Sequence, residues 1–154
     1  MRGLDSRSTS GHEGFMGRCL ELAAVARSQG NTAVGSLVVL DGLIVGEAGE
    51  TLPAGRSVTG HAEVLACQGG LDRTGRDDLA GAVLYTTAEP CFMCSYVIRH
   101  LRVAQVVLGV ETPLIGGVTS NHPILTDPAL DHWRPAPIVV LGVLRADCER
   151  LKQT

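Results

Sequence analysis

The chain has 154 residues, of which 45% are hydrophobic and 19% charged, and this is enough apolar material for one domain with a buried core. No apolar run approaches the roughly 20 residues of a membrane span, the polar first thirteen residues lack the apolar segment of a secretory signal, and five cysteines are an odd number for a disulfide framework. These features favour the cytoplasm, and the formal net charge of −3 favours a small substrate over a nucleic acid, whose binding usually requires a basic surface.

The N-terminal part of the chain predicts a tail followed by a helix. Residues 1–12 predict a flexible tail, which leaves residues 13–154 as a single domain. From Glu13 to Gly30 apolar residues recur at spacings of three and four, which is typical of an amphipathic helix, and Gly30 is a natural C-cap. The apolar positions are Phe15, Met16, Cys19, Leu20, Leu22, Ala23 and Ala26.

A β-hairpin is expected next. Residues 33–40 are rich in residues that favour strands, and residues 43–48 return after Asp41-Gly42, a strong two-residue turn signal. The strands should therefore be antiparallel neighbours. A polar loop over residues 49–60 then leads to the second helix.

The middle of the chain predicts a β-α-β unit. The second helix should begin at His61 and stop at Gly69-Gly70. A short apolar strand over residues 82–86 is followed by a helix over 91–101 and a strand over 103–109. A helix between two short apolar strands indicates that these strands are parallel.

The C-terminal part predicts a long irregular segment, a strand and a helix. Residues 111–131 contain glycines and prolines and have the length of a functional lid or wall. A strand over 138–141 and a helix over 143–151 complete the chain. The fold class is therefore α/β, a three-layer α/β/α sandwich around a mixed five-stranded sheet.

Two cysteines with the spacing Cys-x-x-Cys stand out in this arrangement. Cys91 and Cys94 would lie on one face of a helix, about one turn apart. Pro90, just before them, suits the first turn of a helix. The positive end of the helix dipole favours thiolate, which is the form that binds a metal.

His61 is the natural third ligand. Two cysteines and one histidine leave one position of a tetrahedral zinc open for water, as in catalytic zinc sites. Glu63 lies two residues after His61, where its carboxylate could move the protons of that water. The pattern H-x-E…P-C-x-x-C is typical of zinc-dependent deaminases, in which the glutamate is an acid and base and not a ligand.

Two other interpretations of these cysteines are weaker. A redox Cys-x-x-Cys pair does not require an upstream His-x-Glu. A closed structural zinc site needs a fourth ligand, for which Cys67 is a candidate, but Cys67 falls on the apolar face of its helix.

The chain resembles the cytidine deaminase-like superfamily, most closely the branch of tRNA adenosine deaminases, guanine deaminases and fungal-type cytosine deaminases. The motifs that carry this resemblance are Gly60-His61-Ala62-Glu63 and Glu89-Pro90-Cys91-Phe92-Met93-Cys94. The resemblance implies a zinc ion held by His61, Cys91 and Cys94, with Glu63 as the residue that carries protons. It also implies a five-stranded sheet with helices on both faces, and a homodimer or larger homo-oligomer.

Five further residues are candidates for substrate contacts under this resemblance. Glu50 stands where the branch usually has an asparagine, and an ionised carboxylate accepts hydrogen bonds only, so it would prefer a substrate that presents N–H groups or a positive charge. The alternative is that the alignment is shifted by one residue and Glu50 is a loop glutamate that points to solvent. The backbone N–H of Ala62 could orient the water or the departing amine, and Phe92 could touch the base. Glu111 could bind an exocyclic amine, and Trp133 could stack on a flat heterocycle or simply pack.

The sequence therefore predicts a zinc-dependent hydrolase of the C–N bond of a cyclic amidine, which releases ammonia. The expected substrate is a free nucleobase of guanine or cytosine type, or an aminotriazine or pterin, and the expected partner is this small molecule and not a membrane or a nucleic acid. One alternative is a tRNA-specific adenosine-to-inosine deaminase. Another is a zinc-binding interaction module that has lost turnover, against which the intact Glu63 argues.

Overall fold

The computed structural model describes residues 6–51 and 58–153, and for residues 6–10 and 153 the backbone alone. No helix in these ranges is long and apolar enough to cross a membrane. The elements in chain order are α1 (Ser6–Ser28), β1 (Gly35–Leu40), β2 (Leu43–Gly49), α2 (Ala62–Thr74), β3 (Val83–Ala88), α3 (Phe92–His100), β4 (Gln105–Val110), the 3-10 helix η2 (Pro128–Leu130), β5 (Ile138–Val140) and α4 (Arg145–Gln153).

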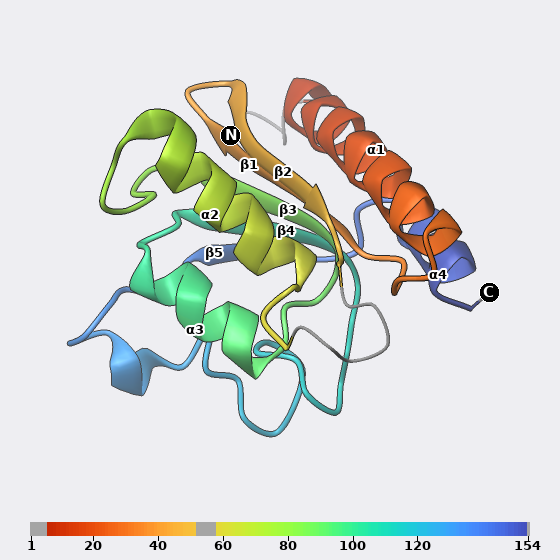
Figure 1. The fold of residues 1–154 in the computed structure, drawn as a ribbon. Coiled ribbons are helices and arrows are strands. Elements are labelled where there is room, and N and C mark those ends of the chain that lie inside the picture. Colours follow the sequence, from red (N-terminus) through yellow and green to blue (C-terminus); the bar gives the residue numbers. More distant parts are fainter. Residues whose placement is uncertain (1–5, 52–57, 154) are drawn as a thin grey trace.

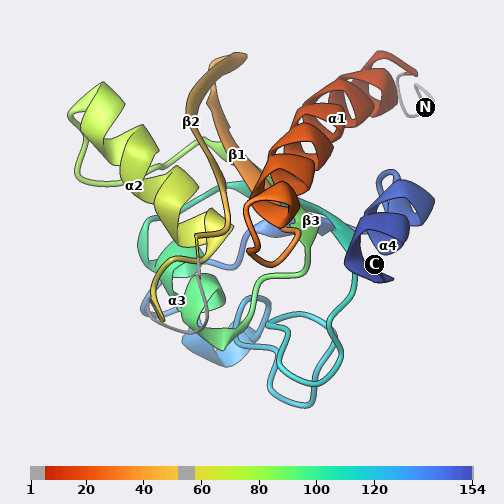
Figure 2. The ribbon, with the colours of Figure 1, turned by 45° about the vertical axis from the view of Figure 1, so that its right-hand side comes forward.

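The five strands form one mixed sheet in the order β2-β1-β3-β4-β5. β1 is antiparallel to β2 and β3, whereas β3, β4 and β5 are parallel to one another. Helices α1 and α4 cover one face of the sheet, and α2 and α3 cover the other (Figures 1 and 2). The predicted three-layer α/β/α sandwich is confirmed, including the parallel β3-α3-β4 unit.

The layers follow from the alternation of side chains along the strands. In β3, Leu84 packs in the hydrophobic cluster under α2 and α3, and Tyr85 packs in the cluster under α1. The hairpin between β1 and β2 has the predicted turn, since Asp41 and Gly42 both have positive φ, 52° and 79°.

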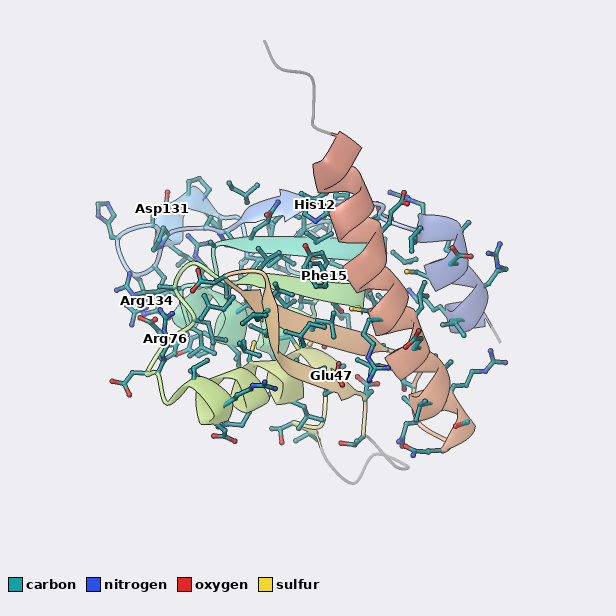
Figure 3. All side chains as sticks on the ribbon, turned by 90° about the horizontal axis from the view of Figure 1, so that it is seen from above. His12, Phe15, Glu47, Arg76, Asp131 and Arg134 are labelled. Atoms are coloured by element: carbon teal, nitrogen blue, oxygen red, sulfur yellow. The ribbon has the colours of Figure 1, made fainter. Side chains whose placement is uncertain are left out.

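Helix α1 begins at Ser6 and not at Glu13, so residues 6–12 of the expected tail belong to the helix, while residues 1–5 lie outside the described part. His12, in this N-terminal extension of the helix, contacts β3, since its Nδ1 atom lies 2.8 Å from the Tyr85 hydroxyl. Figure 3 shows α1 lying across the strands, with Phe15 one turn further along, 5.0 Å from the Tyr85 ring between centroids. Residues 6–12 are polar, so the sequence carries no amphipathic pattern that would predict this part of the helix or its contact with β3.

Helix α2 does not stop at Gly69-Gly70 but continues to Thr74, where Gly75 caps it with a φ of 68°. The two glycines instead lie where α2 meets the sheet. A Cβ on Gly46 of β2 would stand 2.1 Å from the Ala66 carbonyl oxygen, so helix and strand are in backbone contact there. The other element boundaries agree with the prediction to within two residues.

Candidate metal centre and catalytic carboxylate

Three ligand atoms from separate parts of the sequence converge at one end of the sheet. The Nδ1 atom of His61 lies 3.5 Å from the Sγ atoms of both Cys91 and Cys94. The group fits within 4.8 Å. Tetrahedral zinc with its usual bond lengths separates a nitrogen and a sulfur ligand by about 3.6 Å, so these atoms suit a single zinc ion with one position left open.

The beginnings of two helices position these ligands. His61 is the N-cap of α2, and Cys91 is the N-cap of α3, both with extended backbone. Cys94 lies one turn into α3 and is fully buried. Because β3 leads directly into Cys91, the sheet, α2 and α3 together fix the geometry of the ligands.

The two thiols share a proton unequally. The side-chain hydrogen bond between Cys91 and Cys94 lowers the pKa of Cys91 to about 5 and, together with burial, raises that of Cys94. Cys91 is thus ready to bind a metal as thiolate, whereas Cys94 must give up a proton when the metal enters.

Glu63 lies beside the three ligands in the first turn of α2. Its side chain is 4% exposed, and burial raises its pKa to about 7. Oε2 lies 3.5 Å from the Cys94 sulfur, and Oε1 accepts a hydrogen bond of 3.0 Å from the Thr86 hydroxyl. A carboxyl group with this pKa can take up and release a proton near neutral pH.

Thr86 was not singled out by the sequence analysis. Its hydroxyl lies 3.0 Å from Glu63 Oε1 and 2.9 Å from the Ala88 carbonyl oxygen, and its single proton can satisfy one of them at a time. The available signal was strand alternation, which places Thr86 on the same face as Leu84 and hence toward α2.

Glu89 is the second residue whose role the sequence analysis missed. Its buried carboxylate accepts hydrogen bonds of 2.9 Å from the backbone N–H groups of Thr112, Val118 and Thr119, and one of 2.6 Å from the Thr119 hydroxyl. A Cβ on Gly116 would stand 1.8 Å from Glu89 Oε2, so the loop passes the carboxylate as closely as glycine allows.

This loop forms one wall of the site. Gly117 donates its N–H to the Pro90 carbonyl oxygen at 2.9 Å, and Gly116 forms an isolated β-bridge with Cys91. The expected wall over residues 111–131 is therefore attached to the turn that carries the metal ligands.

Three of the five candidate substrate contacts lie close to the metal ligands. Ala62 is the first residue of α2, directly after His61, and Phe92 is the first residue of α3, 5.9 Å from the His122 ring between centroids. Glu50 is 6% exposed and interacts electrostatically with His61 and Cys91, and its burial raises its pKa. Their contact with a substrate stays a prediction.

The other two candidates are engaged elsewhere. Glu111 accepts a hydrogen bond of 2.5 Å from Arg145 of α4. Trp133 stacks on Tyr96 of α3 with 5.2 Å between ring centroids, and Arg134 lies over it; Figure 3 shows Arg134 far from α1. These contacts favour a packing role for Trp133 and a salt-bridge role for Glu111.

The comparisons with known proteins agree with this geometry. Residues 9–110 match the family model described as the cytidine and deoxycytidylate deaminase zinc-binding region. The tRNA-specific adenosine deaminase of Aquifex aeolicus is 34% identical over 131 residues, which is 83% of this chain and 87% of that protein. The tRNA-specific adenosine deaminase of Agrobacterium fabrum is 34% identical over 139 residues, with coverages of 87% and 90%.

Solved structures show the same fold. A structure from a study of A-to-I editing by tRNA:A34 deaminases at the wobble position of transfer RNA superposes with a TM-score of 0.82 and 29% identity, over 89% of this chain and 97% of that one. A mutant of NE0047 in complex with 8-azaguanine gives a TM-score of 0.78 at 22% identity, over 92% and 82% of the two chains. Because residues 9–110 match the zinc-binding region and contain the group of His61, Cys91 and Cys94, the chain belongs to the cytidine and deoxycytidylate deaminase zinc-binding family.

Proposed function

We propose that this protein is a zinc-dependent enzyme that hydrolyses an adenosine of tRNA to inosine, at the wobble position of the anticodon. The observation that carries this proposal is the similarity to tRNA-specific adenosine deaminases, which spans 83% of the chain at 34% identity and includes the whole candidate site. The fold shared with a tRNA:A34 deaminase supports it.

The prediction of a free nucleobase as substrate, with its place in purine or pyrimidine metabolism, was wrong, as was the view that nucleic acid is the less favoured partner. The relatives that match most of the chain carry the name tRNA-specific adenosine deaminase. The argument from charge failed because a net charge of −3 sums over the whole chain and does not describe any one part of its surface.

The residues of the site have distinct roles in the proposed reaction, in which water and adenosine give inosine and ammonia. Zinc, held by His61, Cys91 and Cys94, would supply a Lewis acid that lowers the pKa of water. Glu63 takes a proton from the attacking water and delivers it to N1 of the adenine ring, which makes C6 electrophilic. After the water oxygen has bonded to C6, Glu63 takes the remaining proton from the new C6 hydroxyl and gives it to the amine, which leaves as ammonia when the C6–N6 bond breaks.

The remaining contacts orient the reactants. To the backbone N–H of Ala62, the first residue of α2, we assign the stabilisation of a group that gains negative charge. Phe92, next to Cys91, contacts the base. Thr86 donates to Glu63 Oε1 and so leaves Oε2 to face the reacting atoms.

Inosine formation in an anticodon stem-loop RNA tests the proposed function. The assay compares this RNA with free adenine, adenosine, guanine and cytosine, and it uses Glu63→Ala protein as the blank. We expect inosine in the stem-loop at one adenosine and no ammonia from the small molecules. Ammonia from a free base, with an unchanged stem-loop, would refute the proposal.

Thr86→Val should lower kcat about tenfold, because the valine keeps the shape of the side chain but removes the hydrogen bond that orients Glu63. Zinc content should stay at its wild-type value, since Thr86 is not a ligand. Thr86→Ser is the matched control, because it retains the hydroxyl. Equal kcat values for the valine and serine variants would show that the hydroxyl does not orient Glu63.

A further inference from the structure

The turn over residues 112–116 presents three apolar side chains to solvent beside the metal centre. Pro113, Leu114 and Ile115 are all exposed, Leu114 at 85% and Ile115 at 46%. Among the described residues, Leu114 is the most exposed large hydrophobic side chain. A run of three exposed apolar residues is unfavourable in water unless it serves a contact.

The turn is held in place at both of its ends. Thr112 donates its N–H to Glu89 Oε1 at 2.9 Å, and Gly116 donates its own N–H to the Thr112 carbonyl oxygen at 2.7 Å. The backbone therefore closes on itself between these two residues. Such a fixed apolar projection loses little conformational freedom when it enters a contact.

The position of the turn relative to the metal ligands follows from Gly116, which forms an isolated β-bridge with Cys91 at the end of the sheet where α3 begins (Figure 1). Leu114 is two residues before Gly116, so their Cα atoms lie within about 8 Å of each other. Stacked nucleotides of one strand are about 3.4 Å apart, so this span corresponds to about two base steps. The bases next to a nucleotide that enters the site therefore come within reach of the turn.

The chemistry of the turn suits the faces of bases and not phosphates. None of the residues 112–117 is charged. Proteins that separate stacked bases insert side chains such as Pro, Leu and Ile between them, and these three types stand here in succession. An enzyme that acts on a base must take this base out of its stack, and the unstacking has to be offset by contacts with the protein.

We infer that Leu114 is a wedge that enters the base stack of the RNA substrate, in the space that the target adenosine leaves when its base reaches the metal centre. Pro113 and Ile115, its neighbours in the turn, extend the apolar surface that meets the uncovered base faces. The inference rests on the proposed function and adds to it a residue that stabilises the unstacked form of the substrate.

KM for the stem-loop RNA gives the first test. Leu114→Ser should raise KM about tenfold and leave kcat within about twofold, because the leucine surface that the bases bury is lost. Leu114→Met should restore KM to within about twofold of wild type, since methionine also serves as a wedge. Zinc content should be the same in both variants, because Leu114 is not a ligand.

Leu43→Ser is the matched control. Leu43 is 69% exposed and begins β2 at the hairpin, which lies beyond the start of β3, whereas the ligand turn follows the end of β3. The same substitution at the opposite end of the sheet should leave KM and kcat at their wild-type values.

Unstacking itself is measured with stem-loops that carry the fluorescent base 2-aminopurine directly 5′ or 3′ of the target adenosine, because stacking quenches this base. Glu63→Ala protein is used so that the RNA is bound but not converted. Binding should raise the fluorescence of one of these RNAs at least about threefold. Protein with both Glu63→Ala and Leu114→Ser, at a saturating concentration, should give less than about half of this rise.

An undiminished rise in fluorescence with the Leu114→Ser protein overturns the inference, and the proposed function stands if wild-type protein still forms inosine in the stem-loop. If Leu114→Ser instead dissociates an oligomer in light scattering while the fluorescence rise is unchanged, the turn contacts a second copy of the chain and the inference is also overturned. If wild-type protein converts a free base and no stem-loop, the inference and the proposed function are overturned together.

Discussion

Glu63→Ala protein is expected to lose at least about 10³-fold in inosine formation, within the range of a general acid–base residue, while it still holds zinc. The loss follows because Glu63 is the buried carboxylate beside the three ligands, with one oxygen 3.5 Å from the Cys94 sulfur. Inosine is measured by mass spectrometry of the digested RNA, and zinc by elemental analysis of the same sample.

The fold should tolerate this change. Without the Glu63 carboxylate, the Thr86 hydroxyl can still donate to the Ala88 carbonyl oxygen, which lies at 2.9 Å. Glu63→Gln is the matched control for volume, and it should be as inactive as the alanine variant because an amide does not carry protons at neutral pH. Activity above about one hundredth of wild type in the glutamine variant would contradict the proton-carrying role.

Glu89→Ala is expected to destabilise the protein by about 3 kcal/mol and to reduce activity severely, because it leaves three backbone N–H groups and one hydroxyl without their acceptor. In a domain of this size that corresponds to a fall in Tm of about 6–12 °C. Thermal unfolding followed by circular dichroism gives the change in stability, and the stem-loop assay gives the change in activity.

Glu21→Ala is the control for Glu89→Ala. Glu21 makes an exposed ion pair of 2.8 Å with Arg18, and such exposed pairs contribute little to stability. Its Tm should therefore stay within about 3 °C of wild type. If Glu89→Ala unfolds at the same temperature as the Glu21 variant, the carboxylate does not hold the loop in the way the hydrogen bonds indicate.

The grouping of His61, Cys91 and Cys94 could be predicted from the sequence because the chemistry of zinc restricts both residue type and spacing. Cys91 and Cys94 are three residues apart on one helix, and His61 and Glu63 are two residues apart in the sequence. The hairpin was equally accessible, since Asp41-Gly42 suits positive φ at both turn positions. Local signals of this kind are sufficient when the structural requirement is itself local.

The features that were missed depend on contacts between distant segments. Gly69-Gly70 has the composition of a helix end, yet α2 continues because it packs against the glycine of β2 that faces it. Glu89 resembles any acidic residue before a proline until the loop after β4 is placed around it. The expectation of a small substrate rested on total charge, which does not show where cations gather on the surface.

The attachment of Glu89 to the loop after β4 also bears on how a substrate reaches the metal. Residues 111–119 contain no helix or strand, yet three of their backbone N–H groups donate to the Glu89 carboxylate, two residues before Cys91. Swinging this wall outward would break several hydrogen bonds at once. This wall is therefore preformed, and under the proposed function the conformational cost of binding would fall on the RNA, whose target base must leave its stack to reach the site.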